Sequence, residues 1–433
     1  MFNAETLEEK WSAVLDHPDC TPITNRYKRS TIARMLENQE QSSKEQQAIN
    51  EDFGTSVDSV KNFDPVLISL VRRAMPSIIA YDVAGVQPMT QPTGLIFAMK
   101  TLYRSDSSAA DGVEDGQEAQ FFGKDDPRQN VGPDTAFSGG EDGGAISTSA
   151  GEKLKGKRQN SSDKTGFGEM GFEIIKTSVE AKTRALRATY TTELAQDLKA
   201  VHGLDAESEL ANILSTEILA EINREIVNGI HDSAIVAGID GSGQFDLQAN
   251  ADGRWAVEKF KALNFHIEVE ANRIGKDTRR GKGNWIICSS NVASALAAAG
   301  MLDATTALSS TVGEIDATAS LFAGTLNGRI KVFIDPFTDS DIVTVGYRGS
   351  NPYDAGVFYC PYVPLQLARA IGEDDFQPRI GFKTRYGLRC NPYVSDGNAY
   401  AETDLHFGGS GQNKYFRNFV VSGLTDYVNG VAD

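Results

Sequence analysis

The sequence predicts a fold of mixed helices and strands, on three observations. Apolar residues recur at helical spacing over Ala206–Ile230, behind Asp205, a residue type favoured at helix N-caps. Short apolar or alternating strands fill much of the last 200 residues. A long stretch rich in Gly and Ser separates two further strands, Leu95–Tyr103 and Phe172–Tyr190. The C-terminal strands are separated by more chain than helical crossovers require, so a doubly wound parallel sheet is not favoured.

Length and composition indicate an ordinary water-exposed protein of several subdomains. The chain has 433 residues, which predicts two or three subdomains, and 40% hydrophobic and 23% charged residues. No apolar run reaches the roughly 18 residues of a membrane span, and the N-terminus is charged and amphipathic, unlike a signal peptide. A net charge of −17 argues against a protein that binds DNA by neutralising its phosphates.

The four cysteines are scattered and form no CxxC pair. They are Cys20, Cys288, Cys360 and Cys390. This spacing predicts free thiols in a reducing compartment, and neither a zinc site nor a cofactor is expected.

The first 50 residues predict two polar helices, over residues 6–17 and 26–50. The second helix ends in a tract rich in Gln, Glu, Ser and Lys with little to bury, which is typical of a solvated or transient segment. A short helix is expected over Pro65–Ile79, with prolines near its two ends.

The strands Leu95–Tyr103 and Phe172–Tyr190 are expected to pair as a long arm. The chain between them, residues 105–169, has few apolar anchors and is predicted to be a long loop. Pro88, Pro92 and Gly94 turn the chain just before this arm.

The central part of the chain predicts two consecutive helices. The first covers Thr192–His202 and is closed by Gly203; the second, Ala206–Ile230, would be about 38 Å long at 1.5 Å per residue. The residues expected on its apolar face are Leu210, Ile213, Leu214, Ile218, Ile222 and Ile226.

Five strands and one helix are expected towards the C-terminus. A buried strand over Asn284–Ser290 leads into an Ala-rich helix. The remaining strands are residues 328–337, 341–349, 355–370 and 381–393, and in the last of them Phe382, Thr384, Tyr386, Leu388 and Cys390 share one face.

No catalytic motif is convincing. Gly151–Lys157 has the spacing of a phosphate-binding loop, but Arg158 stands where Ser or Thr should bind magnesium, so a solvated basic loop is favoured. The five histidines are isolated, and His202 is expected near a helix C-terminus. No nucleophile and base occur together, so an enzyme is not favoured.

One charged cluster on the long helix remains ambiguous. Glu221, Arg224 and Glu225 fit an ion pair, a contact between subunits or a solvated face, and the solvated face is favoured.

Several segments resemble the major capsid proteins of T-even-like tailed bacteriophages. They are "LVRRAMPSIIAYDVAGVQPMTQPTGLIFAMKTLY" (Leu70–Tyr103), residues 169–230, "DAGVFYCPYVPL" (Asp354–Leu365) and "FQPRIGFKTRYGLRCNP" (Phe376–Pro392). "ENQE" (Glu37–Glu40) is similar to the N-terminal propeptide of that family. The chain departs from the family's best-known members over Arg104–Glu169, where they insert a folded subdomain.

The resemblance implies the Hong Kong 97-like capsid fold, of class α+β. The expected segments are an N-terminal propeptide at 1–51, an N-terminal arm at 52–94 and an extended loop at 95–190 that contains the 105–169 excursion. A peripheral domain at 191–283 with its spine helix, an axial domain at 284–370, and return strands of the peripheral domain at 371–433 complete the chain.

The resemblance also implies a structural, non-enzymatic function. The chain would be synthesised in the host bacterial cytoplasm and assemble as hexameric capsomers into an icosahedral or prolate virion head, which encloses DNA without sequence-specific binding. Implied partners are a vertex protein, portal, scaffold or core proteins, a prohead protease, a folding chaperonin and decoration proteins. The alternatives are the paralogous vertex protein, an encapsulin-like compartment, and a hydrolase or nucleotide-binding enzyme.

The resembled family is processed after Glu in a Leu/Ile-x-Glu context, which Ile49-Asn50-Glu51 supplies. Cleavage between Glu51 and Asp52 would leave 433 − 51 = 382 residues. Leu7–Glu9, Leu219–Glu221 and Ile371–Glu373 also fit the context. The position of Glu51, just beyond the polar tract, favours it, since the last two sites fall in folded chain.

Overall fold

A computed structural model of the chain describes residues 4–17, 25–51, 78–104, 169–237, 243–248, 255–303, 321–372, 377–391 and 413–424. Positions 279 and 352 are excepted, and single residues at 23, 72, 75, 148 and 152 are also described. Helices and strands are mixed along this chain, which confirms the α+β class. None of the helices in these ranges is long and apolar enough to cross a membrane.

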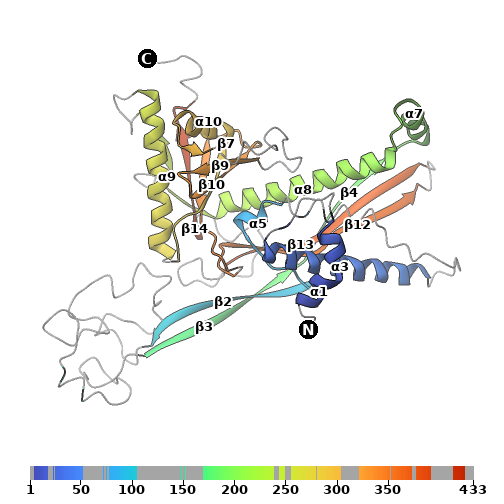
Figure 1. Ribbon diagram of the computed structural model, residues 1–433, viewed down its shortest axis with the longest axis horizontal. Coiled ribbons are helices and arrows are strands. Elements are labelled where there is room, and N and C mark those ends of the chain that lie inside the picture. The colour runs from blue at the N-terminus through green and yellow to red at the C-terminus, as the bar shows by residue number, and fades with distance from the viewer. Residues whose placement is uncertain are drawn as a thin grey trace.

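The strands form two sheets and a separate two-stranded ribbon. The four-stranded sheet has the order β1 (Gly85–Val86), β12 (Val357–Ile371), β13 (Pro378–Cys390) and β4 (Lys182–Thr189). In the ribbon, β2 (Thr93–Arg104) pairs with antiparallel β3 (Glu169–Glu180). Figure 1 shows this ribbon projecting from the body at the lower left.

The eight-stranded sheet is mixed, with parallel and antiparallel pairs. In order it contains β5 (Ala234–Val236), β14 (Asn413–Ser422), β11 (Ile342–Gly346), β7 (Trp285–Ser289), β10 (Ile330–Asp335), β9 (Leu321–Leu326) and β8 (Leu302–Asp303), and β6 (Gln244–Asp246) pairs with β14. The predicted strands at 284–290, 328–337 and 341–349 are therefore confirmed, and the structure shows that they are neighbours in one sheet.

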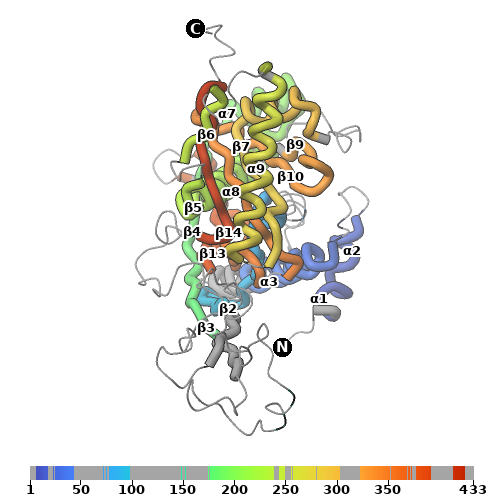
Figure 2. The backbone as a smooth tube through the Cα atoms, turned by 90° about the vertical axis from the view of Figure 1, so that its left-hand side faces the viewer, coloured from blue at the N-terminus to red at the C-terminus, as the bar shows by residue number. Residues whose placement is uncertain are grey.

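Helices pack on both sheets. α8 (Ala206–Ser233) crosses the molecule, with α7 (Thr192–His202) at its far end and the four-stranded sheet beneath it, while α9 (Ala256–Thr278) and α10 (Ser290–Ala298) lie on the eight-stranded sheet (Figure 1). α5 (Ala80–Val83) precedes β1. α1 (Ala4–Lys10), α2 (Ser12–Leu15) and α3 (Arg26–Glu51) lie on one side of the body (Figure 2).

Strand β7 shows why its sequence is apolar throughout. All five of its residues are buried, because the two faces of the sheet contact different cores. Trp285 and Ile287 pack into the core beneath α8, whereas Ile286 and Cys288 pack beneath α9 and α10.

The prediction of a single strand over Phe172–Tyr190 is wrong. The segment forms two strands, β3 and β4, separated at Ala181, whose N–H donates to the Pro92 carbonyl over 2.9 Å. β3 belongs to the ribbon and β4 pairs with β13. One interrupting residue is enough to send the chain from one sheet to another, and alternation alone does not reveal it.

Sheet membership also differs from the expected segment limits. β12 lies within the expected axial segment 284–370 but pairs with β13, and β14, which the sequence analysis did not predict as a strand, lies in the eight-stranded sheet although segment 371–433 was expected to return to the peripheral domain. α9, expected in the peripheral segment 191–283, packs on the eight-stranded sheet. The chain passes repeatedly between the two sheets, so partners lie far apart in sequence.

The long helix confirms most of the predicted apolar face. Leu214, Ile218, Ile222 and Ile226 are buried, and the helix runs on to Ser233. Ile213 is 61% exposed, so its assignment to that face is wrong. Gly203 ends α7 at φ 68°, a left-handed conformation that glycine adopts without steric cost.

The helix predicted over residues 26–50 is confirmed as α3, whereas the one predicted over residues 6–17 is divided into α1 and α2, and part of this N-terminal segment is buried. Ile32, Met35 and Leu36 of α3 are fully buried and pack with Trp11, between α1 and α2, into the core that contains Tyr81 and Val83. The polar composition of the tract conceals this apolar stripe at helical spacing.

Two neighbouring residues of α8 test the helix assignment. Leu214→Ala should lower the free energy of unfolding by about 2–5 kcal/mol, because a buried side chain is replaced by a cavity. Ile213→Ala is the matched control and should change it by less than about 0.5 kcal/mol, since its side chain is exposed. Urea unfolding of the purified subunit measures both, and equal losses would contradict the assigned face.

Candidate functional site: the projecting ribbon and the junction of the two sheets

The ribbon presents an apolar face that the described chain does not cover. Its register pairs Leu95 with Ser178 and Phe97 with Lys176, so these side chains share one face with Ile174. Leu95, Phe97 and Ile174 are 54%, 50% and 56% exposed. Exposed apolar side chains gathered on a projecting element mark an interaction surface.

The opposite face anchors the base of the ribbon to the body. Ile96 and Val179 are buried in a cluster with Met89, Phe358 and Cys360. The approach to β13 is close: a Cβ on Gly387 would lie 2.4 Å from Val179 Cγ1, so glycine is required there. The ribbon therefore has a fixed base and two chemically different faces.

A polar network fixes α8 on the four-stranded sheet. The Arg184 guanidinium on β4 pairs with Glu221 and, at 2.6 Å, with Glu225. Tyr386 of β13 donates a hydrogen bond to Glu225 and accepts one from Arg184 over 2.7 Å. Glu221 and Glu225 are 45% and 38% exposed, in agreement with the favoured expectation of a solvated face, and they also form ion pairs, with Arg184 of β4 rather than within the predicted cluster.

Arg224, the third member of that predicted cluster, does not join the network. Its guanidinium lies 4.9 Å from the ring centroid of Phe337, a cation–π contact. The contact ties α8 to the turn that follows β10.

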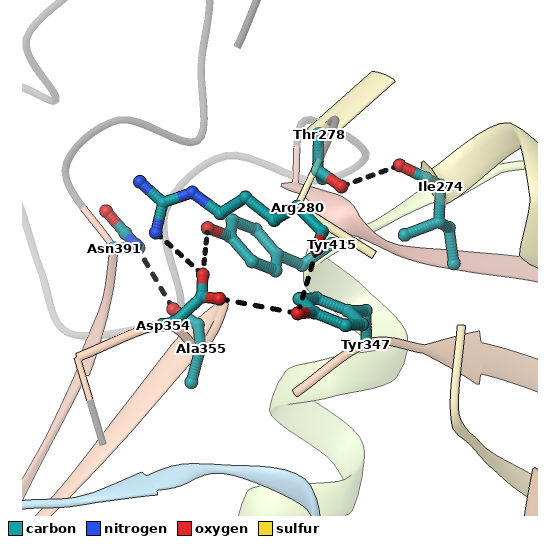
Figure 3. A network of polar contacts seen from close by, with 8 residues as sticks. All are labelled: Ile274, Thr278, Arg280, Tyr347, Asp354, Ala355, Asn391 and Tyr415. Carbon is teal, nitrogen blue, oxygen red and sulfur yellow. Dashed lines mark hydrogen bonds and ion pairs between the residues drawn. The ribbon is translucent and has the colours of Figure 1, made fainter. Parts of the chain in front are cut away.

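A second polar cluster lies where the two sheets meet (Figure 3). The Asp354 carboxylate, just before β12, accepts hydrogen bonds from Arg280 at 2.7 Å and Tyr415 at 3.1 Å on one oxygen. Tyr347 donates to the other oxygen over 3.4 Å. Arg280 follows α9, Tyr347 follows β11 and Tyr415 lies in β14, so one carboxylate in the turn before β12 binds residues of two strands' ends in the eight-stranded sheet and of the chain that follows its covering helix.

Burial keeps the two phenols in this junction protonated. Burial, with the Asp354 charge as a further cause, raises the pKa of Tyr347, and burial raises the pKa of Tyr415 well above its ordinary value. Both therefore remain hydrogen-bond donors at neutral pH. A Cβ on Gly349 would lie 2.2 Å from Asp354 Oδ2, so glycine is also required beside the carboxylate.

The predicted processing residues lie at the end of α3. Ile49 and Glu51 are in its last turn, and Asp52 lies outside the described residues. Helix ends fray more easily than helix interiors, so the backbone here is the part of α3 most readily opened to a protease.

The other candidate residues are not brought together. The phosphate-loop segment 151–157 lies outside the described residues except for Glu152, and Cys20 is outside them too. Cys288, Cys360 and Cys390 are free thiols, as expected, and burial raises the pKa of each to about 12. Within the described ranges no group of three His, Cys, Asp or Glu side chains could hold a metal ion.

Sequence reasoning missed the junction residues. Asp354 begins the motif "DAGVFYCPYVPL", which was used only for its resemblance. A buried acid in an apolar motif is a signal for a charge partner. Arg280, Tyr347 and Tyr415 carry no comparable local signal, since they meet Asp354 only in the folded chain.

The chain matches the profile of the family "Major capsid protein Gp23" over residues 60–421. It is 36% identical to the major capsid protein of Vibrio phage KVP40, over 96% of this chain and 100% of that protein. For Enterobacteria phage T4 the identity is 35%, over 96% and 98%. The chain belongs to the Gp23 major capsid protein family, whose members are structural subunits of the phage head shell.

Two further comparisons concern the vertex-protein alternative and the length of the chain relative to the T4 protein. The capsid vertex protein of Enterobacteria phage T4 is 30% identical over only 52% of this chain and 53% of its own length. The alignment with the Salmonella phage ViI major capsid protein spans 446 positions, against 518 for that of T4, at nearly equal coverage. The T4 relative therefore carries residues that this chain lacks.

Solved structures give a weaker likeness. The capsid of Myoviridae phage XM1 has a TM-score of 0.38 and 9% identity over 79% of this chain and 92% of the other. The capsid of a native GTA particle has a TM-score of 0.38 and 13% identity over 86% and 96%. These scores are low, so the family assignment rests on the sequence matches.

Removal of the Asp354 charge tests the junction. Asp354→Asn should lower the free energy of unfolding by about 2–4 kcal/mol, because Arg280 loses its charge partner in a half-buried site. Asp339→Asn, an exposed acid in the turn after β10, should change it by less than about 0.5 kcal/mol. Chemical unfolding of both variants provides the measurement, and indistinguishable stabilities would show that the junction does not hold the sheets together.

Proposed function

We propose that this chain is the hexamer-forming subunit of a phage head shell, made as a precursor and matured by cleavage between Glu51 and Asp52. The observation that carries the proposal is the ribbon face formed by Leu95, Phe97 and Ile174, which the described part of the subunit leaves exposed. A neighbouring subunit would cover it, because a closed lattice provides every copy with the same partner surface.

The topology supports a revised division of the chain. The four-stranded sheet with α8 would form the peripheral domain, and the eight-stranded sheet with α9 and α10 the axial domain. The N-terminal arm and extended loop keep the limits 52–94 and 95–190, except that β4 joins the peripheral domain.

The comparisons favour the shell subunit over the vertex protein, since major capsid proteins match nearly the whole chain and the vertex protein matches half of it. The subunit would be synthesised in the host cytoplasm and end in the virion, with no enzymatic activity. Its expected partners are the vertex protein, portal, scaffold or core proteins, prohead protease, folding chaperonin and decoration proteins. Its net charge of −17 suits a container that must not trap DNA.

Substitutions at two adjacent residues of β2 distinguish an effect on assembly from an effect on folding. Phe97→Ser should leave subunit stability within about 0.5 kcal/mol, because the side chain is half-exposed, but should abolish closed shells in electron microscopy. Ile96→Ala, on the buried face, should instead cost about 2–5 kcal/mol of stability. Normal shells from Phe97→Ser subunits would refute the role of this face.

Processing is tested by mass. Subunits taken from virions should have the intact mass of 382 residues starting at Asp52, since 433 − 51 = 382. Glu51→Gln should retain the full-length mass, because the charge at the cleaved position is lost. Virion subunits that keep residues 1–51 would overturn this part of the proposal.

A further inference from the structure

Strand β12 is irregular in the middle, and its own prolines are the cause. Its register with β13 shifts between Pro361 and Val363 and again between Val363 and Gln366. Proline has no N–H to donate, so Pro361 and Pro364 cannot hold an unbroken ladder. We call Pro361–Gln366 the β12 bulge.

The backbone groups released by the β12 bulge are bound by α3. Asn38 Nδ2 donates to the Tyr362 carbonyl at 2.9 Å and to the Met89 carbonyl at 2.7 Å. The Leu365 N–H donates to Gln39 Oε1 at 3.4 Å, and the side-chain amide of Gln366 also contacts α3, donating to the Ser42 hydroxyl. Asn38 and Gln39 are themselves buried, although both are polar.

The flanking glutamates of the same motif bind the preceding helix. Lys10 of α1 pairs with Glu37 at 2.7 Å and with Glu40 at 2.5 Å. Trp11 Nε1 donates to Glu37 at 3.2 Å. The four residues Glu37–Glu40 thus connect α1 on one side of α3 with the β12 bulge on the other.

We propose that the β12 bulge is a docking site for the helix over residues 26–42, and that residues 1–51 stay bound there without a covalent link after the chain is cut. The biological meaning of this retention rests on the proposed processing at Glu51. The occupant is this chain's own segment, as the contacts show. Release would exchange the buried hydrogen bonds of the Met89 and Tyr362 carbonyls and the Leu365 N–H for bonds to water and would expose the apolar side chains of α3, which opposes dissociation.

It follows that cutting and release are separate steps. The apolar stripe of Ile32, Met35 and Leu36 remains in the core whether or not the chain is continuous at residue 51. The segment leaves only when the four-stranded sheet changes shape at the bulge or another segment binds those backbone groups.

The test uses the full chain with the recognition site of a sequence-specific protease inserted between Glu51 and Asp52. After cutting, fragment 1–51 should co-elute with the body on size exclusion. In an Asn38→Ala, Gln39→Ala double variant it should dissociate at least about tenfold faster, as expected from the loss of buried hydrogen bonds. Gln41→Ala, exposed on the same helix, is the control and should retain the fragment.

Hydrogen exchange of the uncut chain keeps the proposal testable if the double variant does not survive cutting. Gln39→Ala should speed exchange of the Leu365 amide by roughly tenfold while the amides of Ile286 and Ile287 in β7 are unchanged. Immediate loss of the fragment from the cut wild-type protein, or equal behaviour of the Gln39→Ala and Gln41→Ala variants, would overturn the proposal. Because the cut is artificial, these outcomes do not depend on whether virion subunits start at Asp52.

Discussion

The arrangement of the molecule depends on the pairing of β12, which is bound on both edges over the first part of its length. One edge pairs with β13, and the other pairs with β1 and then accepts hydrogen bonds from Gln87 and Met89 over 2.9 Å each. Asp354 fixes the approach to its first residue from the eight-stranded sheet. Over Phe358–Pro361 the strand therefore has no free edge for non-specific pairing, which a protein meant to associate only through chosen surfaces must avoid.

The position of the ribbon follows from the same strand. Ile96 and Val179 pack on Phe358 and Cys360, so the base of the ribbon is carried by β12. A change in β12 would therefore move the exposed face of Leu95 and Phe97 relative to the body. The N-terminal helices contact β12 on the far side of this anchor, at the bulge. One strand thus links the segment proposed to be removed with the face proposed to contact a neighbour.

Local patterns were sufficient to predict many of the elements. The spacing of apolar residues predicted the buried face of α8. The alternation of side chains predicted the shared face of β13, on which Phe382, Thr384, Tyr386 and Leu388 are buried. α9 was missed although Leu263, Ile267, Ala271 and Ile274 have helical spacing, which a systematic periodicity count would have detected. β14 was missed because its buried residues do not alternate strictly, and its pairing with β5 shifts between Asn413 and Arg417.

The candidate site was less predictable, for a physical reason. Asp354, Arg280, Tyr347 and Tyr415 come from separate elements and meet only when the two sheets form, so no local spacing announces them. The roles of Asn38 and Gln39 also depend on the folded chain, because the β12 bulge that they bind is far away in sequence. Asn38 and Tyr362, for example, are 324 positions apart. The charges at helical spacing on α8 made an ion pair of Glu221 and Glu225 one of the predicted alternatives. Only the fold identifies Arg184 as the partner.

The central claim is that the ribbon binds a neighbouring copy through its apolar face. Electron cryomicroscopy of the assembled shell, at a resolution that separates side chains, tests it most directly. The account predicts that Leu95, Phe97 and Ile174 are covered by another subunit, while Ile96 and Val179 still contact β12 of their own chain. A closed shell in which those three side chains face solvent would contradict it.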